Sequence, residues 1–276
     1  MVKRWLITGS SRGLGRALVE AALESGDQVV ATARNVDALK PLIEKHAARV
    51  VLFPLDVTDP IAADNAVQFA KSSFGGLDVV VNNAGYGNVS AIEDTHIEEM
   101  RREIETNLFG TIIVTKAVIA LMREQRHGHI INVSSVGGRL GSTGRASYSA
   151  AKWGVEGFSE VLAQEMALVG VKVTIIEPGG FRTDFAGSST ELREGRPEYD
   201  AVVGAAARFQ RDYNGRQPGD PAKAAQVILK IAQMENPPSR LALGSDALAA
   251  IRNANTSRRA ELEKWASLSS STDFEG

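Results

Sequence analysis

Seven short runs of apolar and β-branched residues recur along the chain, and longer segments with helically spaced apolar positions separate them. Continuous apolar strands that alternate with helices are typical of a parallel sheet buried on both faces. The pattern therefore predicts an α/β fold with a seven-stranded parallel sheet and helices on both of its faces. The predicted strands lie at residues 4–8, 28–33, 49–55, 77–83, 129–135, 171–178 and 239–244.

The segments between these runs predict helices, and Gly26 and Gly170 stand where glycine commonly ends a helix. No linker rich in proline, glycine or serine divides residues 1–276, and no repeat is visible, so a single domain is expected. Residues 180–219 interrupt the alternation after the sixth strand and predict a substrate lid. The predicted helices lie at about 13–25, 36–46, 60–73, 97–125, 147–169, 220–234 and 246–267.

Composition narrows the function classes. The 276 residues have a formal net charge of −2, which gives no indication of a nucleic-acid or anionic-membrane partner. The chain has no cysteine, which excludes disulfides and thiolate chemistry and fits a reducing compartment. The first apolar run reaches a glycine too soon for a signal peptide or a membrane span. We therefore expect a soluble, cytoplasmic protein that acts on a small molecule.

A glycine-rich loop follows the first predicted strand. The stretch "TGSSRGLG" at residues 8–15 leads directly into a predicted helix. Glycines allow a pyrophosphate to approach the backbone closely, and a helix N-terminus offers unpaired N–H groups and a positive dipole end. The loop predicts dinucleotide binding, although the spacing G-x3-G-x-G is weak evidence alone and an ordinary strand–helix turn is the alternative.

The end of the second strand bears on which dinucleotide is bound. Ala33 stands where a carboxylate would hold the ribose of NAD, and Arg34 follows it. Arg34 and Arg12 of the glycine loop could bind a 2′-phosphate bidentately, so NADP(H) is predicted over NAD(H). Alternatively, both arginines are solvated surface charges. After the third strand, Asp56 and Val57 are expected beside the adenine, unless Asp56 only caps the following turn.

Tyr148 and Lys152 are four residues apart in a predicted helix, so their side chains share one face. A tyrosine that transfers protons near neutrality needs its pKa lowered by about 3 units, or roughly 4 kcal/mol, and a nearby ammonium acts in that direction. Such a pair is frequent by chance. Ser135, at the end of the fifth strand, could reach the same substrate oxygen.

Together these segments resemble the short-chain dehydrogenase/reductase family. The stretches "TGSSRGLG", "DVTD", "NNAG", "NLFG", "NVSS", "YSAAK" and "EPGGFRT" occur in the order and at the spacing of that family. The resemblance implies a Rossmann-type, doubly wound fold and a catalytic tetrad of Asn107, Ser135, Tyr148 and Lys152. It implies cofactor contacts at Gly9, Ser11, Arg12, Gly13, Leu14, Gly15, Arg34, Asp56, Val57, Asn83, Ala84, Gly85, Tyr148, Lys152, Pro178, Gly179, Phe181 and Thr183.

The resemblance also implies a mechanism. Tyr148 would exchange a proton with the substrate oxygen while hydride passes to or from the nicotinamide, and Ser135 would hydrogen-bond the same oxygen. Lys152 would lower the pKa of Tyr148 and bind the nicotinamide ribose, and Asn107 would hold a water that relays protons. The predicted function is an NADP(H)-dependent oxidoreductase that interconverts a ketone or aldehyde and an alcohol. The string "EPGGFRTDF" most resembles the hydroxysteroid- and retinol-dehydrogenase-like branch.

Two other function classes compete with this prediction. A regulator that senses NADP without turnover has no need of the Ser–Tyr–Lys set, and a methyltransferase is expected to carry an acid after its second strand. An NAD(H)-dependent alcohol dehydrogenase of the same fold is a nearer alternative. A metal pair at His127 and His129 is disfavoured because no acidic cluster lies nearby in the sequence, and no metal is expected.

Apolar and aromatic residues near the carboxyl edge of the sheet favour a fairly hydrophobic substrate, unless they only pack the lid. The family resemblance implies a homodimer or homotetramer that pairs residues 97–125 and 147–169. Residues of the second helix could supply an apolar stripe, namely Val155, Phe158, Leu162 and Met166. The candidate pocket residues are Tyr86, Val136, Leu140, Phe181, Phe185, Tyr199, Phe209 and Tyr213.

Overall fold

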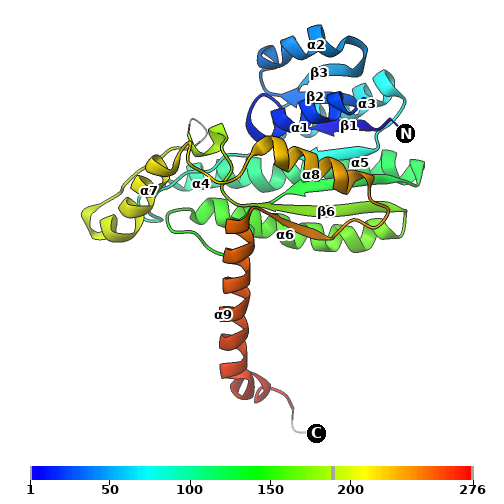
Figure 1. Cartoon of the computed structure of the whole chain (residues 1–276). Coiled ribbons are helices and arrows are strands. Elements are labelled where there is room, and N and C mark those ends of the chain that lie inside the picture. The colour runs from blue at the N-terminus through cyan, green and yellow to red at the C-terminus, as the bar shows by residue number, and fades with distance from the viewer. Residues whose placement is uncertain (1, 188–189, 275–276) are drawn as a thin grey trace.

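The computed structural model describes residues 2–187 and 190–274 and contains one sheet of seven parallel strands. Their spatial order is β3-β2-β1-β4-β5-β6-β7. This order confirms the predicted Rossmann-type, doubly wound sheet (Figure 1). The strands are β1 (Arg4–Ile7), β2 (Gln28–Ala33), β3 (Val50–Pro54), β4 (Val79–Asn82), β5 (Gly128–Val133), β6 (Val171–Pro178) and β7 (Arg240–Leu243).

Helices cover both faces of this sheet, as the continuous apolar strands predict. Successive residues of β1 enter opposite cores: Trp5 and Ile7 lie in one cluster and Leu6 in the other. The first cluster is covered by α1 (Gly13–Glu24), α2 (Lys40–His46) and α8 (Pro221–Gln233). The second is covered by α3 (Pro60–Phe74), α5 (Gly110–Gln125) and α6 (Ala146–Ala167). Gly26 and Gly170 take positive φ values of 92° and 77° after α1 and α6, as predicted.

The predicted helix at 97–125 has an interruption. It consists of α4 (Ile97–Ile104), a π-helical turn (Glu105–Phe109) and α5. The combined segment is long and apolar enough to cross a membrane by length and composition. In the structure, however, Val114, Val118 and Met122 of α5 are buried in the second core cluster. A core helix therefore accounts for the apolar composition.

The predicted lid segment, residues 180–219, forms short helical turns followed by α7 (Ala205–Tyr213). Ion pairs anchor its outer part to the region before and within α4: Arg193 contacts Glu99 at 2.9 Å, and Arg196 contacts Asp94 at 2.7 Å. At its base, Phe181 and Gly219 form an isolated bridge. The segment is thus fixed at both its base and its outer part, and α7 lies at one end of the molecule (Figure 1).

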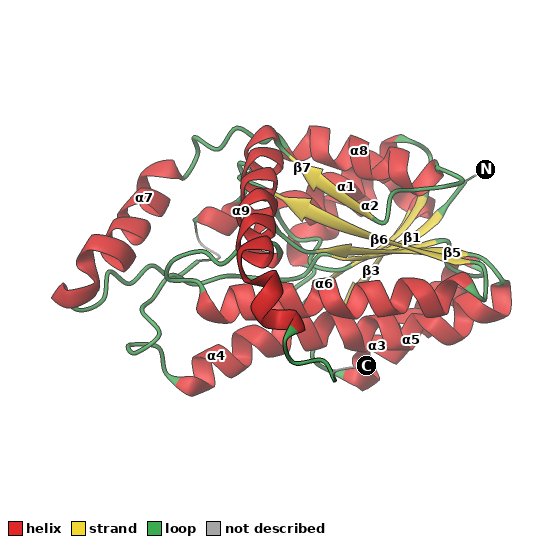
Figure 2. Ribbon diagram, turned by 90° about the horizontal axis from the view of Figure 1, so that it is seen from below, coloured by secondary structure: helices red, strands yellow, loops and turns green. Residues whose placement is uncertain are grey.

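The C-terminal helix α9 (Ser245–Ser270) projects away from the sheet (Figures 1 and 2). Its first turns are attached to the body, because Ala247 and Ile251 are buried. Every described residue from 255 to 274 is exposed. Arg258 lies over the indole of Trp153 on α6, with its guanidinium carbon 4.8 Å from the ring centroid. Trp153 therefore packs against α9 and does not line the cleft described below.

The apolar stripe of α6 faces the interior of the chain. Val155, Leu162 and Met166 are buried, and Phe158 packs partly buried against the second core cluster. The stripe is therefore used within the chain, and pairing of two chains through these helices stays a prediction that the stripe does not support.

His127 and His129, the two histidines considered as a metal pair, have different partners in the structure. His129 of β5 is buried, and its Nε2 is 2.9 Å from the hydroxyl of Thr174, while His127 contacts Asp78. Within the described ranges, no group of three or more metal-binding side chains is found.

Candidate active site

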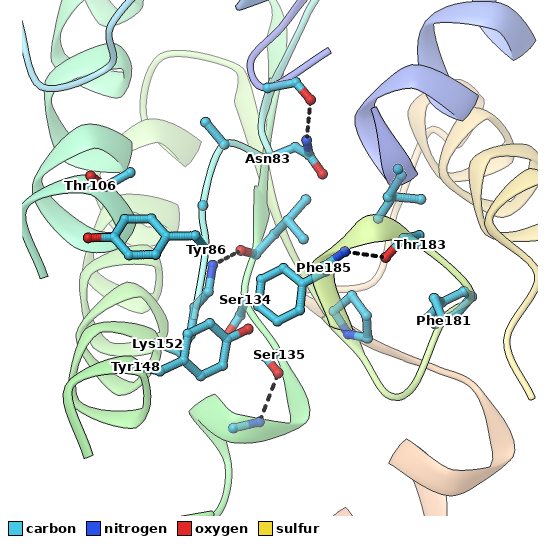
Figure 3. A pocket seen from close by; sticks show the side chains of 18 of the residues that line it. Asn83, Tyr86, Thr106, Ser134, Ser135, Tyr148, Lys152, Phe181, Thr183 and Phe185 are labelled. Atoms are coloured by element: carbon cyan, nitrogen blue, oxygen red, sulfur yellow. Dashed lines mark hydrogen bonds between the residues drawn. The ribbon is translucent and has the colours of Figure 1, made fainter. Parts of the chain in front are cut away.

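A cleft of about 900 Å³ lies at the carboxyl edge of the sheet. Loops that follow the first six strands contribute to its wall, and the strand order reverses between β1 and β4. Ligands of open α/β sheets bind at such a switch point. Figure 3 shows side chains from these loops and from α6 that face this space.

The glycine loop forms the nucleotide end of the cleft. Gly9 and Gly13 have positive φ values of 68° and 58°, a conformation that other residues rarely adopt. Gly15 packs beneath the loop, where a Cβ atom would overlap the carbonyl oxygen of Gly9, and it does not line the cleft. Because α1 begins at Gly13 and has no acidic residue in its first turn, its positive end is available to an anion.

A hydrogen-bond network joins the loops after β1 and β4. The Thr8 hydroxyl accepts from the backbone N–H groups of Asn83 and Ala84, at 3.0 Å each. The Asn83 carboxamide in turn donates to the carbonyl of Thr8 at 2.9 Å and to that of Gly9 at 3.3 Å. The two loops that flank the switch point are therefore held at a fixed separation.

The predicted adenosine contacts follow β2 and β3. Arg34 is exposed and lines the cleft directly after Ala33, the last residue of β2. Asp56 and Val57 also line it. Asp56 accepts hydrogen bonds from the backbone N–H and the hydroxyl of Thr58, at 3.0 and 2.8 Å. Asp56 thus caps its turn and lies in the cleft at once, so the two interpretations do not exclude each other.

At the other end of the cleft, three side chains converge. Ser135 follows β5, and its hydroxyl oxygen accepts from the N–H of Gly137 at 3.0 Å, which leaves the hydroxyl proton for another acceptor. Tyr148 and Lys152 lie one turn apart on α6, and Lys152 Nζ is 5.8 Å from the centroid of the tyrosine ring. Lys152 Nζ donates to the carbonyl of Val133 at 2.8 Å. Figure 3 shows the serine and tyrosine hydroxyls on the same side of the cleft.

Burial is the largest cause of the pKa shifts of Tyr148 and Lys152. Burial raises the pKa of Tyr148 above its ordinary value near 10, and Ser135 and Arg145 act in the opposite direction. Burial lowers the pKa of Lys152 to about 8, an effect that Glu156 partly offsets. In the chain alone, the tyrosine shift is therefore opposite to the one that proton transfer near neutrality requires.

Asn107 lies in the π-helical turn, is fully buried and does not line the cleft. Its carboxamide forms two hydrogen bonds with the backbone of Tyr86: Oδ1 accepts from the N–H at 3.0 Å, and Nδ2 donates to the carbonyl at 2.7 Å. A Cβ atom on Gly85 would lie 2.5 Å from Asn107 Oδ1 and 3.8 Å from Lys152 Nζ. Asn107 is thus close to the lysine, behind the loop that follows β4.

Aromatic side chains cover the tyrosine. The rings of Phe185 and Tyr148 have centroids 5.6 Å apart, and Figure 3 shows them side by side. Five of the candidate pocket residues line the cleft, whereas Leu140, Tyr199 and Phe209 do not. The five are Tyr86, Val136, Phe181, Phe185 and Tyr213.

Several polar residues of the cleft were not predicted from the sequence, and two of them are buried or lie beside the tyrosine. Arg145 lies three residues before Tyr148, with its guanidinium carbon 5.8 Å from the tyrosine ring centroid. Gln217 is 1% exposed, and both polar atoms of its carboxamide lack a partner among the described residues. Neither residue belongs to a recognisable motif; the position of Arg145, three residues before the tyrosine and at the start of its helix, was the available signal.

The cleft brings together all but two of the predicted site residues, Gly15 and Asn107, which support it from behind. Those that line it are Gly9, Ser11, Arg12, Gly13, Leu14, Arg34, Asp56, Val57, Asn83, Ala84, Gly85, Ser135, Tyr148, Lys152, Pro178, Gly179, Phe181 and Thr183.

This fold and this cleft define a dinucleotide-dependent oxidoreductase, and comparison with known proteins identifies the family. The family model described as short chain dehydrogenase matches residues 3–194, so the chain belongs to the short-chain dehydrogenase family, whose cofactor is a nicotinamide dinucleotide. The match confirms the predicted family; the hydroxysteroid- and retinol-dehydrogenase-like branch stays a prediction.

Individual relatives extend over nearly the whole chain. Oxidoreductase BOA17 of Botryotinia fuckeliana is 47% identical over 270 residues and covers 98% of each chain. A 3-ketodihydrosphingosine reductase of Bacteroides thetaiotaomicron is 36% identical over 242 residues and covers 87% of each chain. The crystal structure of a short-chain dehydrogenase from Streptomyces avermitilis is 42% identical, with a TM-score of 0.93, and the match covers 99% of this chain and 100% of that one.

Proposed function

We propose that this chain is an NADP(H)-dependent oxidoreductase that interconverts a carbonyl compound and an alcohol. The observation that carries the proposal is the convergence of Ser135, Tyr148 and Lys152 at one end of a cleft whose other end is the glycine loop. A substrate oxygen placed between the serine and tyrosine hydroxyls would be within reach of both.

When bound, a reduced nicotinamide would supply the hydride that the carbonyl carbon takes up. Tyr148 donates its phenolic proton to the carbonyl oxygen, and the products are an alcohol and the oxidised cofactor. Ser135 donates a hydrogen bond to the same oxygen as negative charge develops on it. The oxidation runs through the same steps in reverse, with Tyr148 as the base.

Because burial raises the pKa of Tyr148 in the chain alone, this mechanism requires nearby groups that favour its phenolate. With its pKa near 8, Lys152 is mostly protonated at pH 7, and its ammonium would favour the phenolate as the proton leaves. Arg145 and Ser135 already act in that direction. The residues behind the cleft, Asn107 foremost, hold the loop after β4 against the lysine and so keep this arrangement in place.

The preference for NADP(H) rests on charge at the end of β2. Ala33 offers no carboxylate to a ribose, while Arg34 and Arg12 line the same end of the cleft. Arg34→Asp is therefore expected to reverse the preference between NADPH and NADH in fluorescence titrations of the purified protein. An unchanged ratio of the two affinities would remove Arg34 as the phosphate ligand and favour the NAD(H) alternative.

The substrate is proposed to be fairly hydrophobic. Val136, Phe181 and Phe185 line the cleft, with Phe185 beside Tyr148, and they offer an apolar wall to the part of the substrate that does not react. The relative named 3-ketodihydrosphingosine reductase agrees with an apolar carbonyl substrate.

Tyr148→Phe tests the proposed function directly. It keeps the ring against Phe185 and removes only the hydroxyl group, so turnover of carbonyl compounds should fall by at least about 100-fold while NADPH affinity stays close to wild type. Tyr199→Phe is the matched control, because the Tyr199 hydroxyl contacts Glu93 outside the cleft. Turnover that survives in Tyr148→Phe would exclude this mechanism. Cofactor binding by the wild type without turnover of any carbonyl compound would favour a sensing role.

A further inference from the structure

The guanidinium of Arg145 stands out among the charged groups of the cleft. Arg145 precedes the first turn of α6, and its side chain reaches the space beside Tyr148 and Phe185. A Cβ atom on Gly87 would lie 3.0 Å from Arg145 Nη1, 3.0 Å from a ring carbon of Tyr148 and 3.2 Å from one of Phe185. The cation thus lies beside the reacting end of the cleft, far along the chain from the predicted phosphate ligands.

Most other partly buried arginines of this fold are paired with carboxylates, and Arg49 donates to the carbonyl of Leu23 at 2.7 Å. Arg139 contacts Glu177 at 2.8 Å, and Arg4 contacts Asp78 at 2.7 Å. Arg145 differs: over residues 2–187 and 190–274, no side-chain hydrogen bond or ion pair of its guanidinium is found. Burial lowers the pKa of Arg145, yet a guanidinium keeps its proton at neutral pH.

The nearest source of negative charge is Glu103, which acts on Arg145 through space. The Glu103 carboxylate is already engaged, because it accepts from the hydroxyl of Ser147 at 2.6 Å and from the N–H of Asn88 at 3.2 Å. Of the described residues that line the cleft, Asp56 and Glu105 carry carboxylates, and neither forms an ion pair or hydrogen bond with Arg145. The donors of Arg145 therefore remain directed to the cleft with no acid of the chain to receive them.

A cation held in a partly buried site without a counter-charge is costly unless a ligand supplies that charge. Guanidinium groups bind carboxylates bidentately, and such hydrogen bonds are stronger than neutral ones. We propose that Arg145 binds a carboxylate of the substrate, so that the substrate is an oxo acid, or the corresponding hydroxy acid, with an apolar remainder. This inference rests on the proposed function, since it places the substrate carbonyl at Tyr148 and Ser135.

The short distance between Arg145 and Tyr148 limits where the carboxylate can stand. Because the guanidinium carbon is 5.8 Å from the tyrosine ring centroid, the acid group lies a few bonds from the carbonyl that reacts. The apolar remainder is then left to the apolar lining of the cleft, to which Val136 contributes. The substrate has a charged end and a hydrophobic end, and the reaction takes place next to the charged one.

The test uses phenylglyoxylate and levulinate, two oxo acids with different spacing between carbonyl and carboxylate, and their methyl esters as neutral partners. Calorimetric titration of protein saturated with its preferred oxidised cofactor measures binding without turnover. At least one acid should bind about tenfold more tightly than its ester to the wild type. Arg145→Gln should abolish this preference, and Arg145→Lys should retain part of it. Arg101→Gln removes an exposed arginine of α4 outside the cleft and should leave the preference intact.

Several outcomes would overturn the inference. Equal affinity for acids and esters, or no binding of either acid in the millimolar range, would exclude a carboxylate at Arg145. An equal loss of acid and ester binding in Arg145→Gln would show a structural role for the arginine. Failure of the proposed function has a different signature, because the wild type would then reduce neither the acids nor the neutral carbonyl compounds, whatever their affinities.

Discussion

Lys152 shows how one residue couples stability to chemistry. Lys152 is 4% exposed, its ammonium donates to a backbone carbonyl, and burial lowers its pKa to about 8. An unfolded lysine titrates near 10.4. Between these two values the unfolded chain binds the proton and the folded chain does not, so the free energy of unfolding rises with pH across this window. Below pH 8 both states carry the proton, and the cost of burying the charge is present in full.

Lys152→Met should therefore lose this pH dependence as well as activity. For the wild type, the contribution of this one group to the rise between pH 8 and 10 is about 1–3 kcal/mol, and the variant should lack it. Turnover should fall by at least about 100-fold. Urea denaturation of both proteins at several pH values, together with steady-state kinetics, measures the two effects. Identical slopes in the two proteins would show that another group titrates there.

The sequence could predict Ser135, Tyr148 and Lys152 because they occur in motifs with fixed spacing. It could not predict the direction of the Tyr148 pKa in the chain alone. That direction depends on burial by the folded chain, to which Phe185 contributes although it lies 37 positions later in the sequence. Arg145 was not predicted for a related reason, since the sequence alone does not show whether a carboxylate will pair with an isolated arginine in the fold.

At the scale of elements, the π-helical turn at Glu105–Phe109 is the departure from the regular pattern. Apolar spacing predicted one helix over 97–125, and the extent is correct. The extra residue in the turn could not be predicted, because it depends on the Asn107 carboxamide meeting the backbone of Tyr86 on a different segment. The seven strands, in contrast, were predictable because each is a short run of mostly apolar and β-branched residues.

Asn107→Ala should weaken both the turn and the cleft. The change leaves the N–H and the carbonyl of Tyr86 without their partner, which costs about 1–3 kcal/mol for a group that water does not reach. We expect a lower midpoint in urea denaturation and a lower turnover number. Asn107→Asp keeps an acceptor for the N–H of Tyr86 but places a second acceptor against its carbonyl. Its free energy of unfolding should therefore be no higher than that of Asn107→Ala. Unchanged stability in Asn107→Ala would mean that the turn persists without these bonds.

At the scale of the whole molecule, α9 adds length without adding to the core. Ala247 and Ile251 attach its first turns, and Asp246 accepts from the N–H of Gly180 at 2.7 Å, next to the cleft. The exposed part keeps large apolar side chains: Leu262, Trp265 and Leu268 are 66%, 48% and 65% exposed. The part of α9 that supports the cleft and the part that extends into solvent are therefore separate.

A chain that ends at Asn255 should keep its fold and its cleft. It loses the contact between Arg258 and Trp153, which contributes about 1 kcal/mol or less at an exposed site. The free energy of unfolding should change by no more than that amount, and cofactor affinity should not change. Denaturation curves and fluorescence titration check both. A large loss of stability would show that another molecule covers the exposed face of α9 in solution.

The separation within α9 has a practical consequence for handling the protein. Residues 255–270 correspond to about 24 Å of helix, and this part of α9 leads away from the sheet (Figure 1). A tag, a dye or a solid support joined to the C-terminus would stand clear of the carboxyl edge of the sheet. The enzyme could then be immobilised through that end with its cleft open to the surrounding liquid, whereas a linkage through α7 would obstruct it.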